Sequence, residues 1–176
     1  VRAAELRLRK LRALKDADRQ YIVFTERHGK ISLIARGTRR SRSKMSPHLG
    51  TYGVVDLMVA KGKRVDRLAG ASLERSAGVV GESIERSSLA QAFFTAVDGL
   101  TRRDQPDERL FSLLSGFLDV LALRAFMPDG ARPPIFDCGI AKLFDLIGVG
   151  LELGACVRCR NPLVPDGNGL NVIRGG

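Results

Sequence analysis

Residues 27–44 read Arg-His-Gly-Lys-Ile-Ser-Leu-Ile-Ala-Arg-Gly-Thr-Arg-Arg-Ser-Arg-Ser-Lys, and they join a predicted strand to a strongly basic segment. In the first half of this stretch, Ile31, Leu33 and Ala35 occupy alternate positions. This period of two is typical of a strand with one buried face. Gly29 provides the turn before it, so the stretch predicts a strand that leads directly into the basic segment.

The basic segment after Gly37 is the strongest indication of function in the sequence. Residues 38–44 are all Ser, Thr, Arg or Lys, and no acidic residue occurs between Glu26 and Asp56. A cationic segment rich in hydroxyl groups suits the phosphate backbone of a nucleic acid, and a solvated loop is the alternative interpretation. The candidate phosphate contacts of first choice are Arg36, Arg39, Arg40, Arg42 and Lys44. Those of second choice are Lys61, Lys63 and Arg64 on a nearby hairpin and Arg7, Arg9 and Lys10 on the first strand.

Positive charge is concentrated in the N-terminal part of the chain. The 176 residues carry a net charge of +10, and residues 1–70 hold 18 Lys and Arg against 6 Asp and Glu, whereas residues 71–176 hold 11 against 13. A basic unit joined to a near-neutral one suggests a polyanion-binding domain attached to a scaffold or partner-binding domain. No apolar run has the length of a membrane span and no secretory signal precedes the first strand, which predicts a cytoplasmic protein. Because the chain does not begin with Met, we expect its N-terminus to be clipped.

Five short strands are expected before residue 78, without a helix between them. Alternating or β-branched patterns predict strands at residues 6–9, 21–25, 31–36, 54–60 and 65–73. This spacing favours a small closed barrel over a sandwich or a parallel sheet.

After these strands the apolar period changes from two to 3.6, which predicts a small helical bundle. Residues 89–100 form the first expected helix, and Gly99 is expected to end it. The second carries Pro106 in its first turn and is apolar through Leu123, so it is expected at the buried centre of the bundle. A third helix is expected at residues 136–147.

The last segment contains half of a metal-binding motif. Cys156-Val-Arg-Cys159 is a Cys-x-x-Cys pair followed by a Pro- and Gly-rich loop, the setting in which zinc ribbons present two thiolates. Tetrahedral zinc needs four ligands, and the remaining cysteine, Cys138, lies in the third helix pattern, where a small buried residue is expected. A redox Cys-x-x-Cys pair would be expected at the start of a helix, whereas a Pro- and Gly-rich loop follows this one. Cysteines that stay reduced agree with a cytosolic location.

These patterns predict an α+β protein in three parts. A five-stranded barrel occupies residues 1–78, an α-helical domain residues 79–152, and a partial zinc-ribbon-like segment residues 153–176.

Several motifs together resemble the recombination mediator family RecO, along the whole chain and most densely over residues 14–44. They are Asp16-Ala-Asp18-Arg19, Phe24-Thr25, His28-Gly29-Lys30, Ala35-Arg36-Gly37-Thr38-Arg39-Arg40, Ser43-Lys44, Val55-Asp56-Leu57 and the spacing to Cys156-x-x-Cys159. The resemblance implies that the barrel is an oligonucleotide/oligosaccharide-binding (OB) fold, followed by a helical domain and a zinc-ribbon-like element. Members with a metal site carry a second Cys pair after a Gly-rich turn. This chain ends at Gly176 without one, so we expect either a truncated chain or a lost metal site, with zinc as a cofactor of the full-length protein.

The resemblance also implies a role in DNA repair and recombination, in the cytoplasm and at the nucleoid. The family binds single- and double-stranded DNA, anneals complementary strands, and works with RecR to load RecA onto strands coated by single-strand-binding protein. Few aromatic residues accompany the many arginines, so binding led by backbone charge with weak sequence preference is expected. The candidate stacking residues are Tyr21 and Tyr52, whereas Phe24 is expected in the core.

Two other functional classes remain open. An enzyme would need a catalytic constellation, but the two histidines, His28 and His48, stand in a turn and a loop without a suitable partner pattern, so no catalysis is expected. A barrel joined to helices is also compatible with an RNA-binding or ribosome-associated factor, because charge alone does not distinguish the two nucleic acids.

Overall fold

A computed structural model describes residues 2–4, 13–14, 18–35, 52–63, 65–123, 134–164, 169, 171 and 173. The strands are β1 (Arg2–Ala4), β2 (Ala13–Leu14), β3 (Asp18–Thr25), β4 (Gly29–Ala35), β5 (Gly53–Ala60) and β6 (Asp66–Ser76). The helices are α1 (Val79–Glu82), α2 (Ile84–Leu100), α3 (Glu108–Ala122) and α4 (Ile135–Leu146). The expected α+β class is confirmed.

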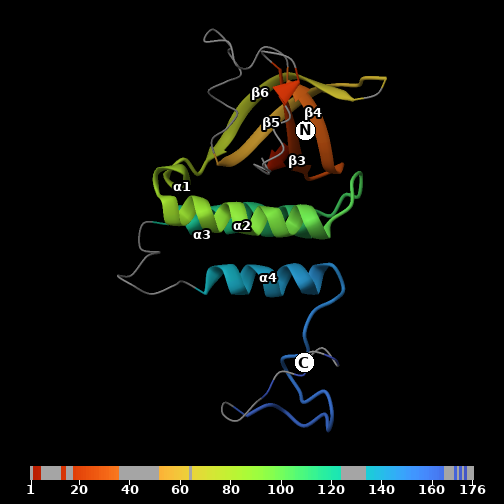
Figure 1. The fold of residues 1–176 in the computed structure, drawn as a ribbon, viewed down its shortest axis with the longest axis vertical. Helices are drawn as coiled ribbons and strands as arrows, with labels where there is room; N and C mark the ends of the chain where they lie inside the picture. The colour runs from red at the N-terminus through yellow and green to blue at the C-terminus, as the bar shows by residue number, and fades with distance from the viewer. Residues whose placement is uncertain are drawn as a thin grey trace.

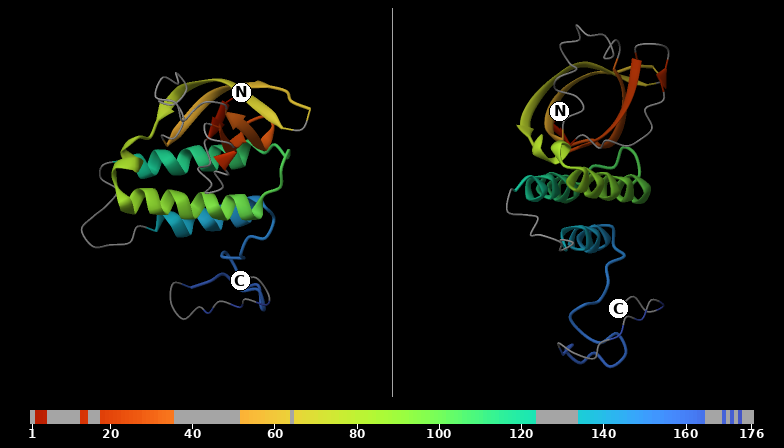
Figure 2. Two further views of the ribbon diagram at one scale, coloured as in Figure 1. Left: turned by 45° about the horizontal axis from the view of Figure 1, so that its top comes forward. Right: turned by 60° about the vertical axis from the view of Figure 1, so that its left-hand side comes forward.

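The strands form one sheet that curves around on itself. Hydrogen-bonded neighbours run in the order β1-β5-β6-β4-β3-β2, and β1 pairs with β3 as well as with β5. Only the β4–β6 pair is parallel among the described strands. The curvature is visible end-on in the right-hand view of Figure 2.

The described residues form six strands where five were expected, and neither β1 at Arg2–Ala4 nor β2 at Ala13–Leu14 was expected at its position. The strand expected at residues 6–9 lies outside the described residues. β6 continues to Ser76, beyond the expected end at Leu73.

The helices stack in layers below the sheet (Figure 1). α2 and α3 lie side by side against the sheet, and α4 lies on their far side. The expected central position of the second helix is confirmed, since α3 contacts α1, α2, α4 and the sheet. No described helix has the length and apolarity that crossing a membrane requires.

Two expected helix boundaries were wrong. α2 continues past Gly99 to Leu100, because Gly99 does not adopt the left-handed conformation that ends a helix, and the N–H of Thr101 still bonds to the carbonyl oxygen of Val97. Pro106 lies before α3 rather than in its first turn. The side chain of Asp107 accepts hydrogen bonds from the N–H groups of two following residues, so Asp107 caps the helix.

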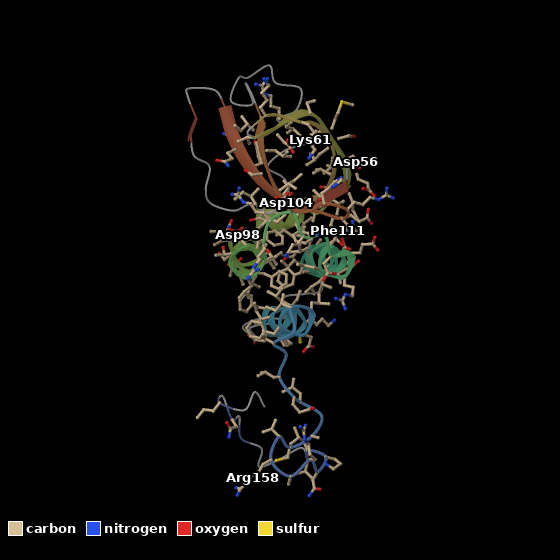
Figure 3. All side chains as sticks on the ribbon, turned by 90° about the vertical axis from the view of Figure 1, so that its right-hand side faces the viewer. Asp56, Lys61, Asp98, Asp104, Phe111 and Arg158 are labelled. Atoms are coloured by element: carbon tan, nitrogen blue, oxygen red, sulfur yellow. The ribbon has the colours of Figure 1, made fainter. Side chains whose placement is uncertain are left out.

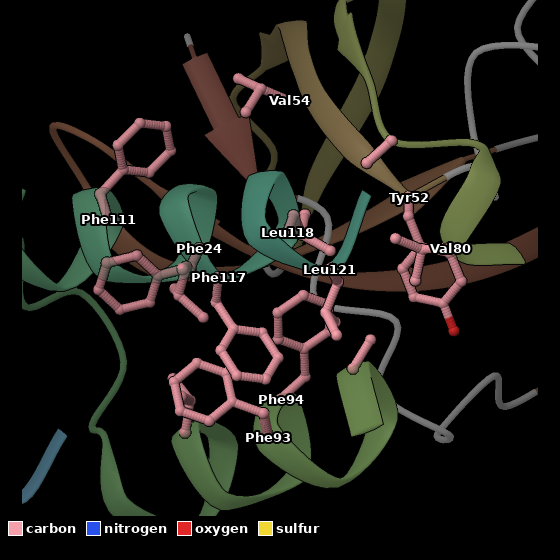
Figure 4. Packing of buried hydrophobic residues seen from close by; sticks show 14 of the residues in the cluster. Phe24, Tyr52, Val54, Val80, Phe93, Phe94, Phe111, Phe117, Leu118 and Leu121 are labelled. Carbon is pink, nitrogen blue, oxygen red and sulfur yellow. The ribbon is translucent and has the colours of Figure 1, made fainter. Parts of the chain in front are cut away.

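The buried residues form two clusters, because β3 is buried on both faces. Val23 faces the inside of the curved sheet, and its neighbour Phe24 faces the helices; each is 1 % exposed. The inner cluster consists of Val23, Leu33, Ala35, Val55, Leu57 and Leu68. The second cluster joins Phe24 and other sheet residues to the helices (Figure 4). In it, the stacked rings of Phe93 and Phe117 lie 4.0 Å apart and join α2 to α3.

Candidate nucleic-acid interface

Most of the predicted phosphate contacts lie outside the described residues. They are Arg36, Arg39, Arg40, Arg42 and Lys44 of the basic segment, together with Arg7, Arg9, Lys10 and Arg64. Lys61 and Lys63 are described, and both are exposed in the turn between β5 and β6.

The pairing of the strands connects this turn with β4, the strand that leads into the basic segment. β4 ends at Ala35, immediately before the segment begins. In the parallel pair, Leu33 and Ile34 lie opposite Asp66 and Arg67, so β6 begins beside the end of β4. Because the two strands are parallel, the turn that precedes β6 leads away from the end of β4 and toward the side on which β4 starts. Figure 1 shows this hairpin tip projecting from the sheet, away from the helices.

The turn is held by an aspartate. The carboxylate of Asp66 accepts a hydrogen bond from the N–H of Gly62 at 3.1 Å and forms an ion pair with Lys61 at 3.2 Å. The N–H of Gly62 and the ammonium of Lys61 lower the pKa of Asp66. Lys63 forms no ion pair with any described residue, so its charge is free to meet a phosphate. The Lys61 pair is exposed and weak, which allows a phosphate to compete for this lysine.

The aromatic residues do not supply a stacking platform as expected. Tyr52 is only 5 % exposed, and its hydroxyl donates to the carbonyl oxygen of Ser87 at 3.4 Å. Its expected stacking role is wrong, because packing of the sheet on α1 and α2 buries the ring (Figure 4). Tyr21 is half-buried against the inner cluster, and its stacking role stays a prediction. The expected core position of Phe24 is confirmed.

Cys138 is exposed, so its expected burial is wrong. Gly139 and Leu143, one helical turn apart, are the buried residues of α4, and Cys138 lies one position off that buried face.

Cys156 and Cys159 lie in a compact turn. The N–H of Cys156 donates to the carbonyl oxygen of Asn161, and the N–H of Arg160 donates to that of Cys156, both at 2.8 Å. The backbone N–H groups of Cys159 and Arg158 lower the pKa of the Cys156 thiol. The described residues contain no group of three possible metal ligands, so this pair provides two donors for an ion that needs four. The donors among the described residues do not by themselves complete a zinc site.

Sequence reasoning missed a buried lysine at the boundary between sheet and helices. Lys30 is only 6 % exposed, and its ammonium group bonds to Asp98 and Thr101 at the end of α2. It also missed that the β3–β4 turn and the α2–α3 loop meet there, where Lys30 contacts the backbone of Arg103 and Asp104. The isolated Gly-Lys pair at residues 29–30 carries no signal for either contact.

Two family models match the chain one after the other. The model described as Recombination protein O N terminal matches residues 9–77, and the one described as Recombination protein O C terminal matches residues 81–166. The chain belongs to the RecO family. The resemblance noted in the sequence is confirmed.

Curated RecO proteins are similar over most of this chain. The DNA repair protein RecO of Cutibacterium acnes is 32% identical over 153 residues, which cover 85% of this chain and 61% of the relative. The protein of the same name from Frankia casuarinae is 32% identical over 155 residues, or 85% of this chain and 60% of the relative. The RecO protein from Symbiobacterium thermophilum is 26% identical over 161 residues, which cover 92% of this chain and 62% of the relative. The chain therefore spans about 60% of the length of these relatives.

Proposed function

We propose that this RecO family chain is the DNA-binding part of a recombination mediator in DNA repair. The observation that carries the proposal is the exposed Lys61–Lys63 turn, which precedes β6, the strand that pairs with β4, and β4 in turn leads into the basic segment. Clustered lysines and arginines bind the phosphate backbone of DNA whatever its sequence, so both single and double strands are ligands. The relatives, which are named as DNA repair proteins, support the same role.

We further propose that five strands form an OB-fold barrel. The support is that β1 pairs with both β5 and β3, so the succession of paired strands returns to its start. The domain boundaries expected at residues 78 and 152 belong to this proposal, and the interval between β6, which ends at Ser76, and α1, which begins at Val79, agrees with the first of them. OB barrels bind nucleic-acid strands across one face and its adjoining loops.

The reaction context follows from the family. The protein would anneal complementary strands and, with RecR, load RecA onto strands coated by single-strand-binding protein, in the cytoplasm at the nucleoid. We assign no catalytic step to its residues. Its role would be to hold DNA and partner proteins together.

Salt-dependent binding to single-stranded DNA tests the proposal. If four or five cations contact phosphates, log affinity should fall with log salt concentration at a slope of roughly −3, since each contact contributes about −0.7. The Arg39→Gln, Arg40→Gln, Arg42→Gln variant should flatten this slope by about two.

A matched control removes the same charge far from the sheet. Lys142→Gln, Arg158→Gln, Arg160→Gln alters exposed residues of α4 and the C-terminal segment, and it should leave the slope near the wild-type value. If the triple Arg39, Arg40 and Arg42 variant shows the same salt dependence of affinity as wild type, the basic segment is only a solvated loop. Stronger binding of structured RNA in a direct competition would favour the RNA-binding alternative.

A further inference from the structure

A second group of basic residues lies where the sheet meets the helices. Arg27 and His28 stand in the turn between β3 and β4, and Arg102 and Arg103 stand in the loop between α2 and α3. All four are exposed. We call these four residues the junction surface. Figure 1 and the left-hand view of Figure 2 show the turn and the loop side by side.

Backbone contacts hold the two segments of the junction surface together. The N–H of Asp104 donates to the carbonyl oxygen of Lys30 at 3.1 Å, and Lys30 and Arg103 form an isolated parallel bridge. Gly29 lies so close to the backbone of Gln105 that a Cβ atom at residue 29 would overlap the carbonyl group. The turn and the loop are thus packed directly against each other, without side chains between them at this point.

The turn itself is stabilised by a buried hydroxyl group. Oγ1 of Thr25 donates to the carbonyl oxygen of Gly29 and accepts the N–H of His28, each at 3.0 Å. Thr25 is fully buried. Arg27 and His28 are therefore presented from a fixed backbone, which lowers the entropic cost of binding a ligand.

The arginines of the junction surface have no acidic partner in the part of the chain that the structure describes. None of Arg27, Arg102 and Arg103 forms an ion pair or a side-chain hydrogen bond with any residue that the structure describes. Other exposed cations do form pairs, such as Arg75 with Asp119 at 2.7 Å. An unpaired arginine can meet a phosphate without first losing a protein partner.

Nearby acids are mostly neutralised within the protein. Asp98 pairs with Lys30 at 2.9 Å, and Asp107 accepts hydrogen bonds from the N–H groups that it caps and lies 3.4 Å from Arg109. Asp104 is exposed and lies where the sheet meets the helices (Figure 3), so its charge opposes that of the neighbouring arginines in part. Glu26, next to Arg27 in the sequence, adds a second carboxylate, and three arginines against these two acids leave the junction surface positive.

A cavity beside the junction surface suits an unpaired base. Its volume is about 450 Å³, and Arg102 and Gln105 provide polar groups in its wall. Phe24, Leu110 and Ile147 provide apolar lining. Unstacked bases of single strands bind to such mixtures of apolar surface and hydrogen-bonding groups, whereas bases within a duplex are not available to enter.

The junction surface lies at the start of β4, and the basic segment follows the other end of this strand in the sequence. The strand begins at Gly29, next to the junction surface, and ends at Ala35, where the basic segment starts. Six residue steps in a strand span roughly 20 Å. This distance exceeds the screening length of about 8 Å at physiological salt, so two polyanions at the two ends would repel each other only weakly.

We propose that the junction surface binds a second DNA strand while the basic segment holds the first. The proposal rests on the DNA-binding function proposed above and adds a second site to it. Annealing requires two negatively charged strands on one protein, and the two ends of β4 are further apart than the screening length, which allows each end to serve one strand.

The test counts the strands that one protein binds. Two non-complementary single strands of about ten nucleotides, one with a donor and one with an acceptor fluorophore, are mixed with the protein, and energy transfer and sedimentation are recorded. Wild type should bind two strands per chain and produce energy transfer. Arg102→Gln, Arg103→Gln should retain the first strand, lose the second, and flatten the salt slope of the second step by about 1.4.

The control is Lys142→Gln, Arg158→Gln, which removes the same charge from other exposed residues and should bind two strands like wild type. Saturation of wild type by one strand would overturn the second site but leave DNA binding intact. Binding of two strands by the Arg102→Gln, Arg103→Gln variant would overturn the second site in the same way. Failure of wild type to bind any strand would overturn the proposed function together with this inference. Unfolding curves verify that both variants remain folded.

Discussion

The ammonium group of Lys30 lies 2.9 Å from Oδ1 of Asp98 and also donates to the carbonyl oxygens of Asp98 at 2.7 Å and Thr101 at 2.6 Å. These bonds join β4 to the C-terminal end of α2, and they use all three donors of the lysine. Carbonyl groups at the end of a helix lack partners within the helix and lie at the negative end of its dipole. Lys30 therefore stabilises the helix end and its attachment to the sheet with one charge.

Replacing Lys30 should destabilise the protein. Lys30→Met keeps the apolar stem but leaves two carbonyl groups and a carboxylate without their donor. We expect the free energy of unfolding to fall by about 2 to 3 kcal/mol, less than for a fully buried pair, because the Asp98 side chain is 34% exposed and water can reach it. Urea unfolding followed by circular dichroism measures the change.

The matched control is Lys61→Met, which breaks the pair with Asp66 at a lysine whose side chain is 89% exposed. Surface pairs contribute little, so this variant should unfold close to the wild-type midpoint. Equal effects of the two substitutions would contradict the structural role of Lys30.

Substitution of Gly29 by alanine should be strongly destabilising. Gly29 has φ +64°, which disfavours any side chain, and a Cβ atom would overlap the backbone carbonyl of Gln105. We expect a loss of at least about 2 kcal/mol in urea unfolding. In contrast, Gly99→Ala places a methyl group in open space within α2 and should stabilise by about 0.5 to 1 kcal/mol. If Gly29→Ala and Gly99→Ala changed the free energy of unfolding in the same direction, the close approach of Gly29 to Gln105 would be refuted.

The cap of α3 should give a pH-dependent contribution to stability. Partial burial raises the pKa of the Asp107 carboxyl, but the N–H groups of Leu110 and Arg109 and the Arg109 guanidinium together lower it below its ordinary value. A lowered pKa in the folded state means that the stabilisation is present above the ordinary pKa of aspartate and is lost as pH falls through the folded-state pKa. Asp107→Ala should therefore cost about 1 kcal/mol near neutral pH and less at about pH 3.

Asp107→Asn serves as the control, because asparagine caps a helix without titrating. The free energy of unfolding of Asp107→Ala and Asp107→Asn should differ by the same amount at both pH values. A wild-type advantage over alanine that persists in acid would show that the carboxylate charge is unimportant.

Complementary strands should anneal faster in the presence of the protein, without a nucleotide cofactor. Two cationic surfaces reduce the repulsion between strands, and the sequence contains no Gly-Lys-Ser/Thr phosphate-binding loop. Quenching of a fluorophore on one strand by a quencher on the other follows the rate. A requirement for ATP would be incompatible with this mechanism.

Zinc should bind this chain weakly. Cys156 and Cys159 can supply two thiolates at about 2.3 Å from the ion, and water would complete the coordination. A mild chelator should remove any zinc, as measured by metal analysis after dialysis. A stoichiometric zinc that resists chelators would reveal ligands beyond the two cysteines.

The local pattern of the sequence was sufficient for much of the fold. The alternation of Ile31, Leu33 and Ala35 predicted β4, and the helical spacing of apolar residues predicted α2, α3 and α4, because these periods reflect which side of a single element is buried. The family motifs likewise depend on residue types at fixed spacing. They were recognisable before any contact was known.

Tertiary structure decided the properties that depend on contacts between distant segments. Lys30 and Tyr52 each carry a polar group at the end of a long side chain, and the sequence pattern does not predict whether such a residue is buried. Each is buried because a helix packs against the sheet at that point. The exposure of Cys138 depends on the rotation of α4 about its axis, which packing against Phe93 and Phe117 determines. The junction surface exists only because the β3–β4 turn and the α2–α3 loop, more than seventy residues apart, pack together. Such proximity is set by the packing of whole elements, and no period within one segment encodes it.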